Sequence, residues 1–174
     1  MPSSYQGRTE QDSQAQKSQS QSAASNLRGN ASGASIATIL AEKGGGIVQI
    51  ATTAALREAM DMMGQNRIGS VLVVDDGVLK GILSERDVVR HLSEQGATGM
   101  ETSVGDVMTA DPVTCAPADP LIAVMQAMTD GNFRHMPVID DGAMAGLISI
   151  RDVVKHRLIE LEYDALRMRQ MIVG

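Results

Sequence analysis

The sequence predicts an α/β (α+β) fold in which one small unit occurs twice and a further helix follows at the C-terminal end. Three observations lead to this prediction. The chain matches itself without gaps at a shift of 65 positions, and a fixed shift of this kind indicates a repeated structural unit. Signals for strands and helices follow in the same order in both halves. Each half also has an Asp-Gly pair between two apolar runs, which favours a β-hairpin.

The repeat is clearest in one hexapeptide. Residues 84–89 (SERDVV) overlay residues 149–154 (SIRDVV), and His91 overlays His156 in the same frame. Two copies of one unit explain these matches and those that follow. The further matched pairs are 75–77 with 140–142, Gly81 with Gly146, Leu56 with Leu121, Met60 with Met125, Met63 with Met128, Val48 with Val113 and Val73 with Val138.

Each copy is expected to contain a strand, a helix, two strands and a second helix. The first helix is marked in copy one by Leu56, Met60 and Met63 at helical spacing. In copy two, Asp119 can cap it, with Pro120 at the first helical position. Three strands with helices on one face bury little apolar surface, so we expect the copies to pack sheet to sheet with pseudo-two-fold symmetry. The strand segments are 46–50, 70–74 and 78–83 in copy one and 112–115, 136–139 and 143–148 in copy two.

The predicted domain organisation has five parts. Residues 1–35 are dominated by Ser, Gln, Ala, Asn and Gly, and should form a disordered tail because they carry too little apolar surface to offset the entropy of folding. A short helix and hinge are expected over residues 36–45, the first copy over 46–103 and the second over 104–160. A helical extension is expected over 161–174.

Apolar residues continue along this predicted C-terminal helix. They recur at alternating spacings of three and four, which favours pairing with another helix. The partner is either a second chain or the apolar face of the short helix over residues 36–43. The residues of this seam are Leu158, Leu161, Ala165, Met168 and Ile172.

Composition argues against several classes of function. The formal net charge is −6 and Trp is absent, whereas nucleic-acid grooves are basic and single-strand binders use aromatic platforms. No segment approaches the roughly 20 apolar residues of a membrane span, and no apolar signal-peptide core occurs near the start. The single cysteine, Cys115, excludes an internal disulfide framework and a Cys-rich zinc site. We expect a cytoplasmic protein that neither inserts into membranes nor binds nucleic acid.

A seven-residue motif occurs in both copies. It reads GILSERD over residues 81–87 and GLISIRD over residues 146–152, and VGDVMT over residues 104–109 leads into the second copy. With these motifs, residues 46–160 resemble the CBS-domain family (cystathionine β-synthase type), whose repeats occur in pairs. The resemblance implies a stand-alone, non-catalytic pair. It also implies an adenine nucleotide ligand, AMP, ADP, ATP or NAD(H), in the clefts between the copies.

The Ser-x-x-Asp part of the motif has two explanations that can hold together. The serine can cap its helix while the acid stabilises the positive helix end. The resemblance implies in addition that Asp87 and Asp152 bind the ribose of a nucleotide, with Ser84 and Ser149 at its phosphate or sugar. This chemistry is consistent, because a helix start attracts phosphate and a carboxylate accepts hydrogen bonds from neighbouring hydroxyls.

The two clefts are expected to differ. Arg134 and His135 of the second copy replace Gly69 and Ser70 of the first. The resemblance places these basic residues on the phosphate held in the opposite cleft, whose ribose lies on Asp87. We therefore expect asymmetric binding that is strongest at Asp87.

Two further groups complete the expected site. Arg86 and Arg151 stand beside the acids and either face phosphate or form surface ion pairs. Because the chain has few aromatic residues, the adenine should lie between aliphatic walls. The candidates, each of them also an expected core residue, are Val48, Ile50, Val113, Met136 and Pro137.

The leading functional hypothesis is regulatory. Nucleotide binding changes the geometry between the copies and thereby acts in trans on an unidentified protein target, and a homodimer is the expected assembly. The alternative is a structural dimerisation scaffold without a specific ligand. An enzyme is least favoured, since each cleft offers one isolated Asp and no metal cluster. His91 and His156 are expected at exposed positions near helix ends.

Overall fold

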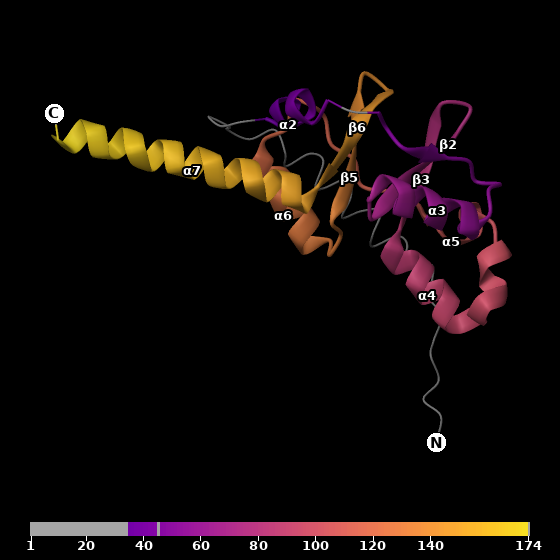
Figure 1. Ribbon diagram of the computed structural model, residues 1–174. Coiled ribbons are helices and arrows are strands. Elements are labelled where there is room, and N and C mark those ends of the chain that lie inside the picture. Colours follow the sequence, from indigo (N-terminus) through magenta and orange to yellow (C-terminus); the bar gives the residue numbers. More distant parts are fainter. Residues whose placement is uncertain (1–34, 45, 174) are drawn as a thin grey trace.

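The two copies have the same order of elements, except that the described part of the second copy has no counterpart of the first strand (Figure 1). The computed structural model describes residues 35–44 and 46–173, so the expected tail, apart from Ser35, lies outside the described residues. The predicted mixed α/β fold with a C-terminal helix is confirmed. The first copy consists of β1 (Gln49–Ile50), α3 (Leu56–Asn66), β2 (Ser70–Asp75), β3 (Val78–Ser84) and α4 (Glu85–Gln95), and the second of α6 (Leu121–Asp130), β5 (His135–Asp140), β6 (Ala143–Ser149) and α7 (Ile150–Val173).

A proline accounts for the smaller sheet of the second copy. In the first copy β1 runs parallel to β2, and the Leu72 N–H donates to the Val48 carbonyl at 3.2 Å. Pro137 stands at the place of Leu72 in the second copy and has no N–H to donate. The expected strand over residues 112–115 is therefore reduced to one parallel bridge between Cys115 and Val138. In the first sheet the strand order is β1-β2-β3-β4, because β4 (Thr109–Ala110) pairs with β3.

Two short helices are docked crosswise between the copies. Helix α2 (Ile36–Lys43) precedes the first copy but docks on the second, where Ile36 N–H donates to Asp119 O at 3.1 Å and Ala37 N–H to Pro117 O at 2.8 Å. Helix α5 (Val104–Val107) precedes the second copy but docks on the first. Its bonds use the equivalent carbonyls, 65 positions earlier: Val104 N–H to Ala54 O at 2.8 Å and Gly105 N–H to Thr52 O at 2.9 Å.

The hydrophobic cores follow this crossed arrangement. Ile36 and Ile39 of α2 are buried in the core of the second copy with Leu121, Val124, Met128 and Ile148. The motif over residues 104–109 supplies Val104 and Val107 to the core of the first copy, with Leu56, Met63 and Leu83. Each core is thus completed by the helix that precedes the other copy in the chain. A 3-10 helix, η1 (Gly96–Glu101), leads from α4 to α5.

Helix α7 continues well past the second copy (Figure 1). Of the predicted seam, Leu158, Leu161 and Met168 are exposed. The possibility that the short N-terminal helix covers this seam is wrong, because the apolar residues of α2 point into the core of the second copy. The helix-cap prediction also shifts by one residue: Pro120 is the N-cap of α6. The Asp119 carboxylate instead accepts a hydrogen bond from the Ala116 N–H at 2.8 Å.

Candidate functional site

Both signature serines stand directly before a helix, with the signature acid folded back on them. In α4, the Asp87 carboxylate accepts a hydrogen bond from the Ser84 N–H at 3.0 Å. In α7, Asp152 Oδ2 accepts one from the Ser149 N–H at 2.9 Å, and the Asp152 N–H donates to Ser149 Oγ at 3.3 Å. Both copies therefore have the helix-capping arrangement. It fixes the two carboxylates at helix starts, where anions are favoured.

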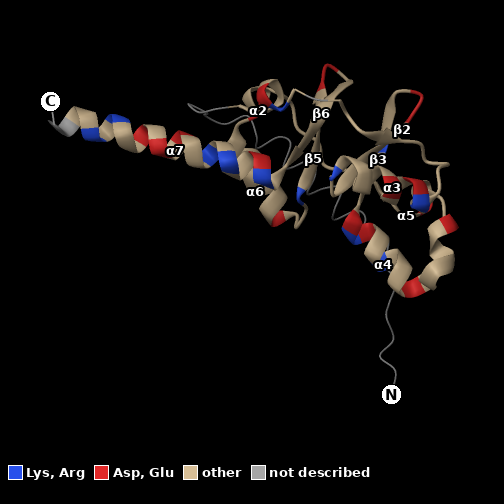
Figure 2. Cartoon of the chain, in the orientation of Figure 1, with Lys and Arg blue, Asp and Glu red and all other residues tan. Residues whose placement is uncertain are grey.

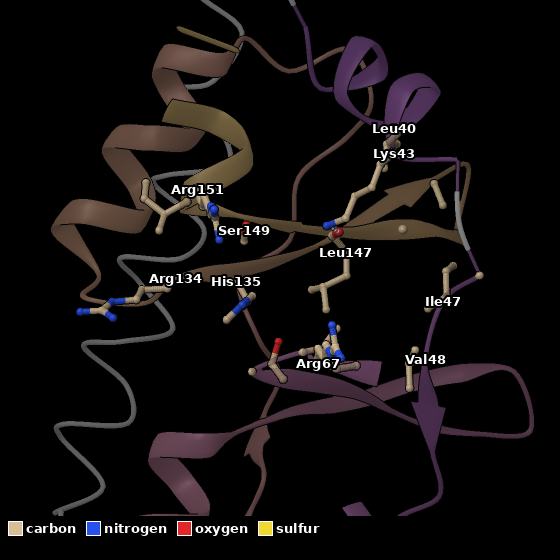
Figure 3. Close-up of a pocket in the computed structure, with 17 residues that line it drawn as sticks. Leu40, Lys43, Ile47, Val48, Arg67, Arg134, His135, Leu147, Ser149 and Arg151 are labelled. Carbon is tan, nitrogen blue, oxygen red and sulfur yellow. Dashed lines mark hydrogen bonds between the residues drawn. The ribbon is translucent and has the colours of Figure 1, made fainter. Parts of the chain in front are cut away.

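A pocket of about 490 Å³ lies where α2, the start of α7 and strands of both copies meet (Figure 3). Its charged and polar lining residues are Lys43, Arg67, Ser70, Arg134, His135, Ser149 and Arg151. Its larger apolar residues are Leu40, Ile47, Val48, Ile68, Leu147 and Ile150. A volume of this size is typical of small-molecule sites, which combine an apolar wall with a few polar groups.

The lining of the pocket is cationic although the whole chain carries a formal net charge of −6. Four Lys or Arg residues and one His line it, and none of the described lining residues is acidic. Figure 2 shows acidic residues at the tips of both hairpins, and none of these residues lines the pocket. A low-dielectric pocket that gathers charge of one sign favours an anionic ligand.

Lys43 links the pocket to the signature acid of the second copy. Its Nζ donates to Asp152 Oδ2 at 2.8 Å and to the Leu147 carbonyl at 3.0 Å, and Figure 3 shows the side chain reaching from α2 to β6. Burial raises the pKa of the Asp152 carboxyl, but the hydrogen bonds from Lys43 and Ser149 outweigh burial, and its pKa lies below the ordinary value. Asp152 is therefore ionised at neutral pH and neutralised by a lysine of another element.

The signature acid of the first copy has a different partner. Asp87 is buried, and its Oδ1 accepts a hydrogen bond from Arg90 of the same helix at 2.9 Å. Met108 stands at the position equivalent to Lys43 and lies against Gly81. The pocket lining includes none of Ser84, Arg86 and Asp87. Arg86 instead donates to the Asn132 carbonyl of the second copy at 3.2 Å.

The structure groups Arg134 and His135 differently from the sequence-based expectation. They line the pocket with Ser149 and Arg151 of their own copy, and not with Asp87. The reason is the hairpin of β5 and β6, whose register places His135 directly opposite Ser149. In Figure 3 the Arg134 side chain extends away from His135, so His135 is the nearer of the two to the centre of the pocket.

His135 is a neutral group in this cationic pocket. Burial is the first cause that lowers its pKa, and the charge of Lys43 lowers it further. The charges of Asp152 and Glu85 oppose the shift without cancelling it, and that of Arg134 adds to it. The imidazole is therefore uncharged near neutral pH and can gain a proton when an anion arrives.

Ser70 and Arg67 are pocket residues that the sequence did not single out. The Ser70 hydroxyl is buried, with 2% of the residue exposed, and it has no hydrogen-bond partner among the residues that the structure describes. An orphaned buried hydroxyl is unfavourable unless something binds it. Arg67 has a φ of 54°, a left-handed conformation that is strained for a long side chain. Lys43, the last residue of α2, is the third such residue.

Most of the expected aliphatic walls are core residues. Val48 lines the pocket. Ile50 and Met136 belong to the cores of the first and second copy, and Val113 packs against the core of the second. Pro137 is buried but does not line the pocket. Besides Val48, the apolar side of the pocket is formed by Leu40 of α2, Ile47 before β1, Ile68 before β2, Leu147 of β6 and Ile150 of α7. Alternation along a strand explains this, because neighbouring residues point to opposite faces.

Three further side chains, two histidines and the cysteine, do not line the pocket. His156 is buried rather than exposed, and its Nε2 lies 3.2 Å from Glu42 of α2. His91 is half-buried and lies 3.0 Å from the Thr102 hydroxyl. Burial raises the pKa of the Cys115 thiol to about 12, with the charge of Asp119 adding to the shift, so the thiol is protonated and unreactive.

The described part of the chain contains no cluster of three His, Cys, Asp or Glu side chains placed to hold a metal ion. In that same part, no helix has the length and apolar character needed to cross a membrane.

The fold and the cationic pocket together define a paired ligand-binding module. The family model of the CBS domain matches residues 46–94 and 104–159. The chain therefore belongs to the CBS-domain family. A curated relative, the mitochondrial CBS domain-containing protein CBSX3 of Arabidopsis thaliana, is 38% identical over 122 residues, which cover 67% of this chain and 59% of the relative. The match thus spans less than two thirds of that relative's length.

Solved structures have the same fold. The CBS-domain containing protein of Agrobacterium tumefaciens has 40% identity and a TM-score of 0.69, and the match covers 71% of this chain and 98% of that one. The CBS domain protein of Pyrobaculum aerophilum, complexed with AMP, has 24% identity and a TM-score of 0.61 over 68% of this chain and 88% of that one.

Proposed function

We propose that this chain is a cytoplasmic, non-catalytic regulatory module that binds an adenine nucleotide in the pocket at the start of α7. The observation that carries the proposal is the lining itself. Lys43, Arg67, Arg134 and Arg151 surround a pocket without acidic lining residues among those described. The orphaned Ser70 hydroxyl adds an uncommitted buried donor to this lining. Such a set of groups fits phosphate.

The positions of the groups suggest how a nucleotide is held. Ser149, Ile150 and Arg151 form the start of a long helix, whose positive end favours phosphate. Ile47, Val48 and Ile68 offer an aliphatic face to a base. By the family resemblance, Asp152 accepts the ribose hydroxyls. That this fold accommodates an adenosine compound is supported by the Pyrobaculum aerophilum protein, which holds AMP.

The ligand is AMP, ADP, ATP or NAD(H) in this proposal, and its binding changes the geometry between the copies. Because the pocket is lined from both copies and from α2, a ligand contacts all three at once. A ligand that binds one relative arrangement more tightly shifts the population toward it. That shift is the signal passed in trans to a protein target.

We also propose that two chains pair through α7. The seam residues Leu161, Ala165 and Met168 are exposed on the part of this helix beyond the second copy. The residues around Glu162 are acidic and those around Arg167 are basic, so an antiparallel pair of these helices brings opposite charges together. A dimerisation scaffold without a specific ligand is the alternative function that this feature favours.

Calorimetric titration with AMP, ADP, ATP, NAD and NADH tests the proposal. We expect Arg151→Ala to weaken binding about tenfold to hundredfold, since it removes a charge-assisted hydrogen bond. Arg86→Ala is the matched control, because it changes the equivalent residue of the first copy, which does not line the pocket. Equal loss in both variants contradicts the pocket assignment. Absence of binding and of any thermal shift with all five ligands favours the scaffold.

A further inference from the structure

The Lys43–Asp152 ion pair joins the pocket to a helix outside the repeat. On the basis of the proposed function, we propose that Lys43 occupies the place of the ligand at Asp152 as long as no ligand is bound. When a nucleotide binds, the Lys43 ammonium moves from the carboxylate to the phosphates, and the carboxylate is released to the ribose. Lys43 is then the residue that makes the pocket select phosphorylated ligands over the free nucleoside.

The hydrogen bonds at Asp152 show why the Lys43 ammonium and the ribose of a ligand compete for the carboxylate. Asp152 Oδ2 accepts three of them, from Lys43 Nζ at 2.8 Å and from the N–H and hydroxyl of Ser149, both at 2.9 Å. An oxygen of a carboxylate has two lone pairs, so Oδ2 has no site for a further donor, whereas Oδ1 accepts no hydrogen bond from the described residues. The Ser149 bonds cap α7 and hold the acid in place. Two neighbouring ribose hydroxyls that bind the carboxylate side by side need both of its oxygens, so the one at Oδ2 binds only in place of Lys43.

The ion pair is exposed enough to be exchanged. The side chain of Lys43 is 46% exposed and that of Asp152 is 28% exposed. Pairs in this range contribute little to stability, because water competes for both charges. Lys43 also lines the pocket beside His135 and Arg151, so a phosphate there is a new partner within reach of the same flexible side chain.

The end of α2 allows this movement while the rest of the helix stays docked. Ile36 and Ile39 are buried in the core of the second copy, and Glu42 lies 3.2 Å from His156. Lys43 is the last residue of the helix and is followed by Gly44, which has a left-handed φ of 36°. Moving the Lys43 side chain therefore disturbs only the last turn, whose closing hydrogen bond runs from Gly44 N–H to Leu40 O at 3.3 Å.

Among the described residues, the signature acid of the first copy has no ion pair with a side chain of another element. Met108 occupies the position equivalent to Lys43, and Asp87 is bonded by Arg90 from its own helix. Displacing Arg90 moves no other element. The exchange thus links ligand binding to a segment that precedes the repeats, and only through the second copy.

The decisive experiment compares adenosine with ATP in Lys43→Met. Adenosine must displace Lys43 without offering it an anion, so the variant should bind adenosine about twofold to fivefold more tightly, the range expected for an exposed ion pair. ATP offers the anion, so the variant should bind it about tenfold more weakly. Opposite changes in the affinities for adenosine and ATP distinguish the exchange from a simple loss of charge. Lys155→Met, an exposed lysine of α7 that does not line the pocket, is the charge-matched control.

The outcomes separate this inference from the proposed function. Weaker binding of both ligands in Lys43→Met makes Lys43 a plain phosphate ligand and overturns the exchange, as does no change in either. Absence of binding of adenosine, ATP and the other adenine compounds to wild type and variant overturns the proposed function and the exchange with it. Hydrogen exchange gives a second readout: ATP should speed exchange of the Gly44 amide in wild type and leave it unchanged in Lys43→Met. Slower or equal exchange in wild type contradicts the movement.

Discussion

Arg67 and Asn132 occupy equivalent positions, 65 residues apart, and have the same left-handed φ of 54° after helices α3 and α6. Asn is well suited to this conformation, and Arg is not. The second copy therefore has the residue that the backbone favours, whereas the first has one that it does not. Arg67 lines the pocket, and Figure 3 shows it pointing from the first copy toward Leu147. The strain is retained where it presents a guanidinium to the ligand site.

Replacing Arg67 with Asn should separate stability from binding. We expect Arg67→Asn to raise the free energy of unfolding by up to about 1 kcal/mol, because the left-handed turn is relieved. Nucleotide affinity should fall about tenfold, since one phosphate-facing charge is lost. Urea unfolding and calorimetry measure the two effects. Asn132→Arg is the reciprocal variant, and it should destabilise the protein; a more stable Asn132→Arg contradicts the argument from strain.

The buried Ser70 hydroxyl gives a second test of the same kind. A buried hydroxyl without a partner costs roughly 1 to 3 kcal/mol, so Ser70→Ala should raise the melting temperature of the ligand-free protein. The increase in melting temperature caused by saturating nucleotide should become smaller, because the alanine cannot bond the ligand. Differential scanning fluorimetry with and without ATP measures both. A variant that is less stable without ligand shows that the hydroxyl already has a partner.

The two signature glycines should differ in their tolerance of a side chain. A Cβ on Gly81 would lie 2.6 Å from Met108 Sδ and 2.7 Å from the Thr109 carbonyl oxygen, which belongs to the paired strand β4. A Cβ on Gly146 would lie 2.6 Å from Leu40 Cδ2, the end of a flexible side chain. We expect Gly81→Ala to cost about 1 to 3 kcal/mol and Gly146→Ala clearly less. Equal losses in urea unfolding would show that Leu40 is held as firmly as the backbone.

Nucleotide binding should take up protons through His135. Burial lowers the pKa of His135, and Lys43 lowers it further, so the folded protein holds this proton less tightly than the unfolded chain does. Stability from this group is therefore present above the ordinary pKa of about 6.5 and declines as the pH falls below it. A phosphate in the pocket raises the pKa again, so affinity should increase from pH 8 to pH 6. Calorimetry in buffers of different ionisation enthalpy should detect the uptake, and His135→Gln should abolish it.

The exposed half of α7 should determine the oligomeric state. Leu161→Glu together with Met168→Glu is expected to convert dimers into monomers in sedimentation velocity, with little loss of melting temperature because both residues are exposed in one chain. Tyr163→Glu is the control, since it is an exposed apolar residue outside the seam. A wild-type protein that is monomeric at all concentrations tested contradicts pairing through α7.

Much of the fold and part of the pocket could be predicted from the sequence. The shift of 65 positions gives the order of elements. The Asp-Gly turn at Asp141 alone would pair His135 with Ile148, but a β-bulge between Val138 and Ile139 shifts the register so that His135 lies opposite Ser149. The pairing with Ser149 places His135 at the start of α7, and the bulge that produces it has no evident signal in the sequence. The expectation that it serves the cleft of Asp87 came from the resemblance rather than from the hairpin.

The residues that sequence reasoning missed owe their roles to contacts between distant segments. The pattern of Ile36 and Ile39 shows that one face of α2 is buried, but a periodic pattern does not say against which copy. Lys43 at the end of a helix is an ordinary way to balance the helix dipole, and its partner Asp152 lies 109 positions away. Ser70 has the pattern of any strand residue, and only the three-dimensional packing shows that its hydroxyl is unpartnered.

The crosswise docking of α2 and α5 means that neither copy is an independent folding unit. During synthesis α2 leaves the ribosome before either copy, yet its partners Leu121 and Ile148 are made more than 80 residues later, so the second core closes last. A fragment that starts at residue 104 carries away Val104 and Val107, which belong to the first core, and leaves behind Ile36 and Ile39, which belong to the second. Cutting the chain between the copies therefore opens both cores at once.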